Sequence, residues 1–260
     1  MKRTLLCGLI AAVSLSCSAF AYRPQVPVQV DGTRITNGYI ENGSTYVSLR
    51  ALLSAMGAWD IQWNNSTKEA SAHSAARSLT ASPNENRITV DGHSYSGTVT
   101  LRNGTVYIPL RMTAELLGSS VLWDPYLDGA AVTTEESPYD ATELYWLSRV
   151  IYAESGAEPL TGQIAVGNVV LNRVNNPEFP SSIPSVIFDR KNGVQFEPVS
   201  NGSIYKTPSD ASIEAAKQAL DGQRPVGDAL YFYAPDLSPG TWITANRIYL
   251  TTIGCHRFYL

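Results

Sequence analysis

The chain has 260 residues, of which 44% are hydrophobic and 16% are charged, and its net charge is −4. This length suits one large domain or two small ones, and the hydrophobic content is sufficient for buried cores. Nucleic-acid binding needs a basic surface, yet the segment from Pro138 onward holds 12 acidic against 9 basic residues. Beyond the N-terminus no apolar run approaches the roughly 20 residues that span a bilayer. We therefore expect no nucleic-acid partner and no membrane span in the mature chain.

Residues 1–21 have the three parts of a secretory signal peptide. Lys2 and Arg3 give a positive start, residues 5–15 form a short apolar run, and residues 19–21 read Ala-Phe-Ala, which is a cleavage pattern of small residues. We expect this segment to be removed and the mature chain to be secreted.

The cysteines indicate a mature chain without an intrachain disulfide. Cys7 and Cys17 lie inside the signal peptide, so only Cys255 remains. We expect Cys255 to be a small buried apolar residue. It cannot form a catalytic dyad with His256, because adjacent residues of a strand point to opposite faces.

Two segments of the first half share one pattern at a spacing of about 60 residues, which indicates an internal repeat. Each has Val-Asp-Gly, then Asn-Gly, a short strand, Leu-Arg, a helical stretch ending near Gly, and Trp. The first copy contains Val30-Asp31-Gly32, Asn42 to Arg50, Met56-Gly57 and Trp63, and the second contains Val90-Asp91-Gly92, Asn103 to Arg111, Leu117-Gly118 and Trp123.

Both copies predict the same elements. Asp-Gly and Asn-Gly between short alternating runs are hairpin turn signals. In the first copy, residues 28–30, 45–47 and 60–63 predict strands, and residues 48–56 carry apolar side chains at helical spacing before a glycine C-cap. The two copies together predict one compact α+β domain of hairpins and two short helices over residues 26–134.

This repeat resembles the small domain named after the N-terminus of copper amine oxidases. The resemblance covers residues 26–134 and does not imply copper chemistry here. The segment holds only His73 and His93, one in each copy, whereas a copper site built from imidazoles needs several such ligands together. We expect an accessory module that holds the protein at a surface or acts as a spacer.

A polar linker at residues 135–138 leads to a second domain, residues 139–260. Asp140 and Glu143 have the spacing of a helix capping box. Leu147 and Ile151 then lie on one helical face, and Glu154 falls on the same stripe before Gly156 ends the helix.

Glu154 is the candidate catalytic residue because its position predicts burial. Burial disfavours a charged carboxylate and raises its pKa, and a carboxylic acid that stays protonated near neutral pH can donate to a glycosidic oxygen. The alternative is a structural glutamate that caps the helix or pairs with Arg149.

The remainder of the domain predicts a second, strongly apolar helix that begins with Pro159 at its first position, followed by a loop whose shape is set by prolines. A further helix is predicted from Thr207 to Gly222. A strand over 229–233 and one or two short strands over 247–260, with a turn at Ile253-Gly254, complete the domain. Along these elements the chain resembles the spore cortex-lytic, SleB-type cell-wall hydrolases. The matching residues include Ile151 to Glu154, Gly156, Glu158-Pro159, Gly162-Gln163, Val170 to Val174, Phe179-Pro180, Gln195-Phe196, Ala229 to Tyr233, Trp242 and His256.

The resemblance implies a lysozyme-like α+β catalytic domain that cleaves the glycan strands of peptidoglycan, with Glu154 as catalytic acid. It implies lytic transglycosylation after N-acetylmuramic acid, in which the same glutamate later acts as base for the sugar's own 6-hydroxyl. A hydrolytic muramidase would need a partner acid, for which Glu158, Asp228 and Asp236 are candidates, although Glu158 is also suited to cap the second helix. We expect no metal and no cofactor.

Exposed aromatic and amide side chains are expected to bind the glycan, and each candidate could equally be a packing residue. The substrate-binding candidates are Tyr152, Glu158, Gln195, Phe196, Tyr233 and Trp242.

The sequence also bears on two other classes of protein. A zinc amidase fails because His256 is the only histidine of the second domain. A non-catalytic peptidoglycan-binding wall protein that keeps the fold remains the alternative. The sequence does not determine the oligomeric state.

Overall fold

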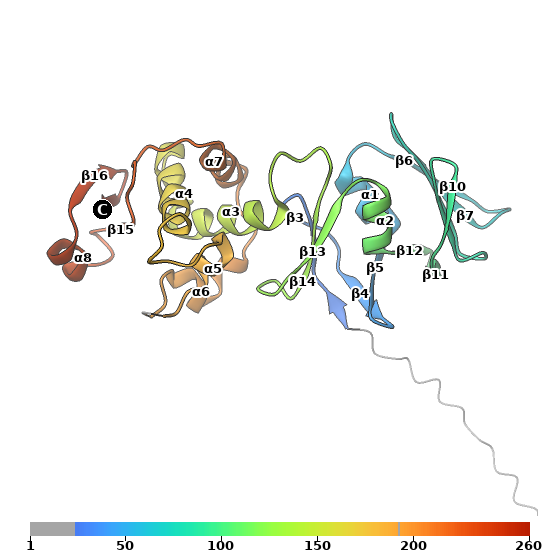
Figure 1. Ribbon diagram of the computed structural model, residues 1–260, viewed down its shortest axis with the longest axis horizontal. Helices are drawn as coiled ribbons and strands as arrows, with labels where there is room; N and C mark the ends of the chain where they lie inside the picture. The colour runs from blue at the N-terminus through green and yellow to red at the C-terminus, as the bar shows by residue number, and fades with distance from the viewer. Residues whose placement is uncertain (1–23, 192) are drawn as a thin grey trace, which may run out of the picture.

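The computed structural model describes residues 24–191 and 193–260. The molecule is elongated, with β-hairpins at one end, a cluster of helices in the middle and a small sheet at the other end (Figure 1). The predicted signal peptide lies outside the described residues. Among the described residues, no helix is long and apolar enough to cross a membrane.

The duplicated segment folds into hairpins with one short helix from each copy, which confirms the predicted class of structure. Both central residues of all four predicted Asx-Gly turns have positive φ, as a tight two-residue hairpin requires. The first copy forms β1 (Gln25–Val26), β2 (Val28–Val30), β3 (Thr33–Arg34), β4 (Gly38–Glu41), β5 (Ser44–Ser48), α1 (Leu49–Met56), β6 (Asp60–Asn64) and β7 (Glu69–His73). The second forms β8 (Ser78–Ser82), β9 (Arg87–Val90), β10 (His93–Ser96), β11 (Thr100–Arg102), β12 (Thr105–Pro109), α2 (Leu110–Leu116), β13 (Ser120–Asp124) and β14 (Gly129–Thr133).

The two copies meet along equivalent strands. β5 pairs antiparallel with β12, and Val47 faces Ile108, its own counterpart in the other copy. Tyr46 faces Pro109 and Ser48 faces Tyr107, so the pairing is self-complementary around a local two-fold axis. The resulting sheet has the order β1-β4-β5-β12-β11.

The two outer sheets are also related by the repeat. One has the order β13-β14-β2-β3, and the other has β6-β7-β8-β9-β10. In the second sheet β8 lies between β7 and β9. In the first sheet the strands that correspond to β7 and β9 in the repeat, β14 and β2, pair directly and in parallel. Each outer sheet therefore combines a hairpin from one copy with strands from the other, so neither copy folds as a separate unit. The apolar side chains of this domain form one core, which includes Val47, Leu52 and Ile108.

The second domain is a bundle of helices followed by a small sheet. Its elements are α3 (Ala141–Ser155), α4 (Leu160–Val174), α5 (Ile183–Ile187), α6 (Glu197–Asn201), η1 (Ser203–Tyr205), α7 (Asp210–Leu220), β15 (Tyr231–Tyr233), α8 (Thr241–Asn246), β16 (Tyr249–Ile253) and β17 (His256–Tyr259). The strand order is β15-β17-β16, with all neighbours antiparallel. The two-domain α+β class is confirmed.

The helices and strands that the sequence patterns predict in the second domain form there, with small differences at their ends. Asp140 caps α3 as predicted, because its side chain accepts from the backbone N–H groups of Thr142 and Glu143. Pro159 is the N-cap residue of α4 and not its first helical residue, and no side chain caps that helix, so the predicted cap by Glu158 is wrong. The prediction that Cys255 is buried is also wrong, because it lies exposed in the turn between β16 and β17.

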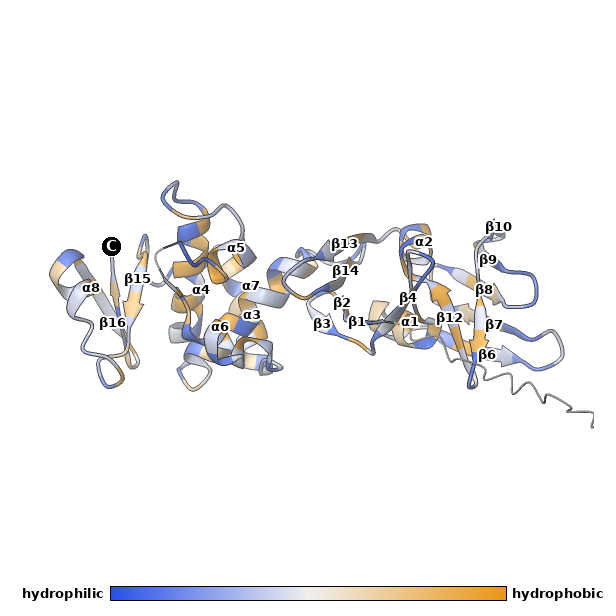
Figure 2. Ribbon diagram, turned by 90° about the horizontal axis from the view of Figure 1, so that it is seen from below, coloured by the Kyte–Doolittle hydropathy of each residue, from blue (hydrophilic) through white to orange (hydrophobic). Residues whose placement is uncertain are grey.

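The helices pack around a mostly apolar core. Trp146 and Leu147 of α3 are fully buried, and α3, α4 and α7 pack against one another along this core. Figure 2 shows hydrophobic residues along α3 and α4. α3 is thereby held rigidly, and this rigidity matters because Glu154 lies near its C-terminal end.

The domains are in direct contact and are not separated by a free linker. The turn between β13 and β14 enters the helical domain, where Leu127 belongs to the same core as Trp146. The indole Nε1 of Trp146 donates to Oδ2 of the buried Asp124 at 2.7 Å, and Tyr126 stacks on Phe188. The hairpin is therefore anchored on α3 by both a charged hydrogen bond and apolar contacts.

Candidate active site

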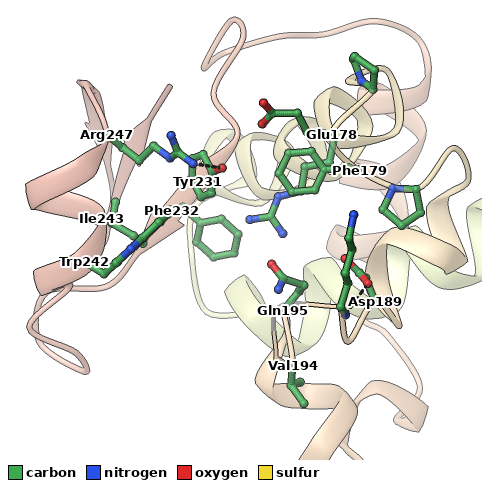
Figure 3. Close-up of a pocket in the computed structure, with 14 residues that line it drawn as sticks. Glu178, Phe179, Asp189, Val194, Gln195, Tyr231, Phe232, Trp242, Ile243 and Arg247 are labelled. Carbon is green, nitrogen blue, oxygen red and sulfur yellow. Dashed lines mark hydrogen bonds between the residues drawn. The ribbon is translucent and has the colours of Figure 1, made fainter.

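A cleft of about 950 Å³ lies between the helical bundle and the C-terminal sheet. One wall carries Tyr231, Trp242 and Arg247 from the sheet region, and the opposite wall carries Phe179 and Gln195 from the loops that follow α4 and α5 (Figure 3). Aromatic faces next to charged and amide groups are suited to a polar ligand that also has apolar faces, such as a sugar chain.

Glu154 is the second-to-last residue of α3, and it is mostly buried. The predicted apolar stripe explains this position, because Leu147 and Ile151 on the same face are fully buried in the core. The alternative ion pair with Arg149 is not formed. The Arg149 guanidinium lies over the Tyr145 ring at 3.4 Å and donates to the Tyr145 carbonyl oxygen instead.

Burial raises the pKa of Glu154 from its ordinary value of 4.5 to about 7, and the negative charge of Glu197 contributes in the same direction. The positive charge of Arg173 opposes both effects. The carboxyl group is therefore close to half protonated at neutral pH. A group in this state can both donate and accept a proton during one reaction cycle.

Arg173 connects Glu154 to the cleft. Glu154 is not one of the side chains that line the cleft, whereas Arg173 lines it and acts electrostatically on the Glu154 carboxyl group. Arg173 is 6% exposed, and burial lowers its pKa to about 10. Its Nε donates to the Leu230 carbonyl oxygen at 2.8 Å, while Nη1 has no hydrogen-bond partner among the described residues. Arg173 is therefore a buried cation with hydrogen-bonding capacity left for a ligand.

Polar residues of α4 hold the irregular segment that precedes β15. Asn172 donates to the carbonyl oxygens of Gly227 and Ala229 at 2.8 and 2.9 Å, and Asn168 donates to that of Gln223. Backbone groups that form no regular structure need such partners when they are buried. This accounts for the Asn-Arg pair at the end of an otherwise apolar helix, because the pair fixes one wall of the cleft.

The outer part of the cleft is formed by stacked aromatic and guanidinium groups. The Tyr231 hydroxyl accepts from Arg247 at 2.8 Å, and the Arg247 guanidinium lies over the rings of both Tyr231 and Trp242 (Figure 3). Trp242 remains 56% exposed, so much of its indole is free to contact a ligand.

The substrate-binding candidates fall into separate environments. Gln195 and Trp242 line the cleft. Tyr152 is partly buried on α3, two residues before Glu154. Phe196 is 1% exposed in the core, beneath the Arg173 guanidinium, and Tyr233 is buried against Tyr259, so both are packing residues in this structure.

Glu158 is directed at the turn between β16 and β17. Its Oε2 accepts from the Cys255 backbone N–H at 3.1 Å, and its Oε1 lies 3.8 Å from Nδ1 of His256. A side chain at Gly254 would collide with this carboxylate. Glu158 therefore ties the sheet to the start of α4. Asp228 and Asp236, the other proposed partner acids, are exposed, and the second carboxylate that acts on Glu154 is Glu197.

The sequence patterns did not single out Arg173, Tyr231, Arg247 or Glu197 as functional residues. Arg173 was a matched position in the resemblance, and an arginine at the end of an apolar helix is a usable signal of a buried charge. Tyr231 and Arg247 come from a strand and a loop whose meeting at one cleft has no local signature, and Glu197, at the start of α6, acts on Glu154 only through the tertiary fold.

Fold and site together define a two-domain protein whose helical domain holds one buried acid next to an aromatic and arginine-lined cleft. Residues 157–259 match the family described as Cell Wall Hydrolase, and residues 29–131 match the Copper amine oxidase N-terminal domain. The second domain is thus similar to the family of cell wall hydrolases.

Individual proteins are similar to the same part of the chain. The spore cortex-lytic enzyme of Halalkalibacterium halodurans is 36% identical over 126 residues, which are 48% of this chain and 37% of that enzyme. The spore cortex-lytic enzyme of Bacillus subtilis is 36% identical over 46% of this chain and 38% of its own length. The solved catalytic domain of the germination-specific lytic transglycosylase SleB from Bacillus anthracis is 36% identical over 47% of this chain and 98% of that domain, with a TM-score of 0.43. The chain spans less than half the length of these full-length relatives.

Proposed function

We propose that this protein cleaves the glycan strands of peptidoglycan, with Glu154 as the catalytic acid and base. The observation that carries the proposal is a buried carboxyl group whose pKa is raised to about 7 beside a cleft of about 950 Å³. The match of residues 157–259 to the family described as Cell Wall Hydrolase supports the choice of substrate. The relatives are named for lysis of the spore cortex, and we extend that class of substrate to this chain.

The reaction that fits best is lytic transglycosylation. Protonated Glu154 gives its proton to the glycosidic oxygen as the bond from the muramic acid C1 breaks. The resulting carboxylate then takes the proton of the same sugar's 6-hydroxyl as that oxygen bonds to C1, so the product is a 1,6-anhydro sugar and Glu154 is protonated again. The nucleophile is intramolecular, so no second catalytic carboxylate is needed.

Hydrolysis by the muramidase route would need a water and a partner acid. Glu158 is engaged by the Cys255 backbone in a turn, which favours the single-acid reaction. Glu197 has the role of raising the Glu154 pKa from nearby. Arg173 and the exposed face of Trp242 are proposed to bind the sugar chain, and Gln195 and Tyr152 are proposed to hydrogen-bond to it.

We further propose the domain division 26–134 and 139–260, joined by residues 135–138, and secretion to the cell wall after removal of residues 1–21. The duplicated domain acts as an accessory to the hydrolase domain.

The test is digestion of purified peptidoglycan by the mature chain and by Glu154→Gln. The turbidity of the suspension is expected to fall with the parent chain and to stay constant with the variant. Mass spectrometry of the released fragments should show 1,6-anhydro ends. Clearing at the same rate by Glu154→Gln would remove Glu154 from its role, and reducing ends alone would establish hydrolysis in place of transglycosylation.

A further inference from the structure

Among the grooves of the duplicated domain, two are related to each other by the repeat, and the catalytic proposal uses neither. The larger has a volume of about 720 Å³ and lies between the β4–β5 turn of the first copy and α2 and β13 of the second. The smaller has a volume of about 150 Å³ and lies between the β11–β12 turn of the second copy and α1 and β6 of the first.

The two grooves are the same site formed twice. Each of the ten residues that line the smaller groove has its repeat counterpart in the lining of the larger one. Trp63 corresponds to Trp123, Arg50 to Arg111, and the turn glycine Gly104 to Gly43. The β5–β12 pairing around the local two-fold axis causes this, because it places the turn of each copy against the helix of the other.

Each groove combines an exposed indole with polar groups. Trp123 is 46% exposed and Trp63 is 39% exposed, although each lies within a strand whose partner strand is largely covered. In the larger groove Nη1 of Arg111 donates to the Val121 carbonyl oxygen at 2.6 Å and lies 3.3 Å from the Glu115 carboxylate. An exposed aromatic face with fixed donors and acceptors beside it is the general composition of a small-molecule or sugar site.

We propose that these two grooves are binding sites for the glycan strand of the cell wall, each contacting sugar units with its tryptophan face. A polymer that repeats one chemical unit is the class of ligand that can occupy both copies of a duplicated site at once, and double occupancy raises the apparent affinity without any new contact. The C–H faces of N-acetylated sugars match the indoles, and their hydroxyl and amide groups match Arg111 and Glu115. The identity of this ligand rests on the proposed function.

The larger groove is mechanically connected to the catalytic helix. Trp123 is followed directly by Asp124, whose carboxylate accepts from the Trp146 indole of α3 at 2.7 Å. α3 carries Glu154, so a single hairpin holds the groove in a fixed position relative to the catalytic residue. A strand bound in the groove is thereby kept near the cleft.

The test measures binding apart from cleavage. The full mature chain carrying Glu154→Gln is titrated with purified glycan strands from which the peptides have been removed, and is also pelleted with intact peptidoglycan. Trp123→Ala, Trp63→Ala and the double variant are compared in this background. Tyr95→Ala is the matched control, because Tyr95 is a similarly exposed aromatic residue (38%) of the same domain outside both grooves.

Trp123→Ala is expected to weaken binding about tenfold, because it removes the face of the larger groove, and Trp63→Ala is expected to weaken it less. The double variant is expected to lose more than the two single effects combined when long strands are used, and Tyr95→Ala is expected to bind like the parent. Trp123→Phe keeps an aromatic face and is expected to restore most of the binding, which separates loss of contact from misfolding.

Unchanged binding in the double variant overturns the proposal. Binding that requires the peptides also overturns it, because the occupant would then be a peptide. A dimer that Trp123→Ala converts to monomer overturns it as well, because the occupant would then be a second copy of the chain. Cleavage by the parent chain is measured separately on short soluble fragments. Cleavage by the parent chain together with binding that the tryptophan substitutions leave unchanged refutes this inference alone, and tryptophan-dependent binding without cleavage refutes the catalytic proposal alone.

Discussion

Glu154 is expected to make the folded protein less stable as the pH rises, and Glu154→Gln removes that cost. A carboxyl group whose pKa rises from 4.5 to about 7 on folding binds its proton more tightly in the folded state. Stability is then lost as the pH rises from about 4.5 to about 7. The full difference corresponds to about 3 kcal/mol, because one pKa unit is about 1.36 kcal/mol. Arg173, whose pKa is about 10, keeps its charge over this range and does not add to the change, and comparison with Glu154→Gln isolates the part that belongs to Glu154.

The assay is chemical unfolding of the parent chain and of Glu154→Gln at pH 4, 5.5, 7 and 8.5. We expect the variant to gain stability relative to the parent as the pH rises, by about 3 kcal/mol in total, and the difference to level off above about pH 7.5. The control is Glu178→Gln, since Glu178 is an exposed cleft residue where such a change has an effect within about 0.5 kcal/mol. A parent-to-variant difference that does not change with pH would show that the Glu154 carboxyl is not desolvated.

The same carboxyl predicts that the rate of glycan cleavage falls about tenfold per pH unit above about pH 7, because the donating form is then depleted, and a rate profile of short-fragment cleavage checks this. Trp146→Phe leaves the buried Asp124 carboxylate without the indole donor at 2.7 Å. We expect the free energy of unfolding, measured with urea, to fall by about 2–4 kcal/mol. A fall of less than about 1 kcal/mol would show that the contact between the domains contributes little to stability. Asn172→Ala leaves the Gly227 and Ala229 carbonyl oxygens without their side-chain donor and removes the Oδ1 acceptor of Arg224. We therefore expect a loss of about 2–3 kcal/mol and, in contrast to Asn175→Ala on the exposed side of the helix end, a lower cleavage rate.

The position of Glu154 could be predicted from the sequence because it depends on residues that are close to it along the chain. The burial of Glu154 follows from its place on the apolar face of a helix with a definite start at Asp140, and periodicity alone reports such a face. Arg247 and Tyr231 could not be identified in this way. Tyr231 lies in the short strand β15 and Arg247 in the segment after α8, and the hydrogen bond between them depends on how the sheet folds back against α4.

Phe196 and Glu158 show why residue type is an insufficient guide. An aromatic ring binds sugar only where it is exposed, and the packing of α6 against the bundle buries Phe196. Glu158 has the chemistry of a partner acid, but the sheet turn brings the Cys255 N–H group to it, and a carboxylate engaged in this way acts as an anchor.

For this protein the sequence by itself determined what depends on neighbours along the chain, namely the four Asx-Gly turns, the Asp140 cap of α3, the duplication and the apolar stripe that carries Glu154. Only the tertiary structure decided what depends on distant segments meeting. It interleaved the two repeats around the β5–β12 pair, inserted the β13–β14 turn into the helical core, and assembled the cleft from α4, β15, α8 and the loops that follow α4, α5 and α8. The physical reason is that dihedral preferences and side-chain periodicity act over a few residues, whereas pairing of strands and burial of charges are selected by the packing of the whole chain.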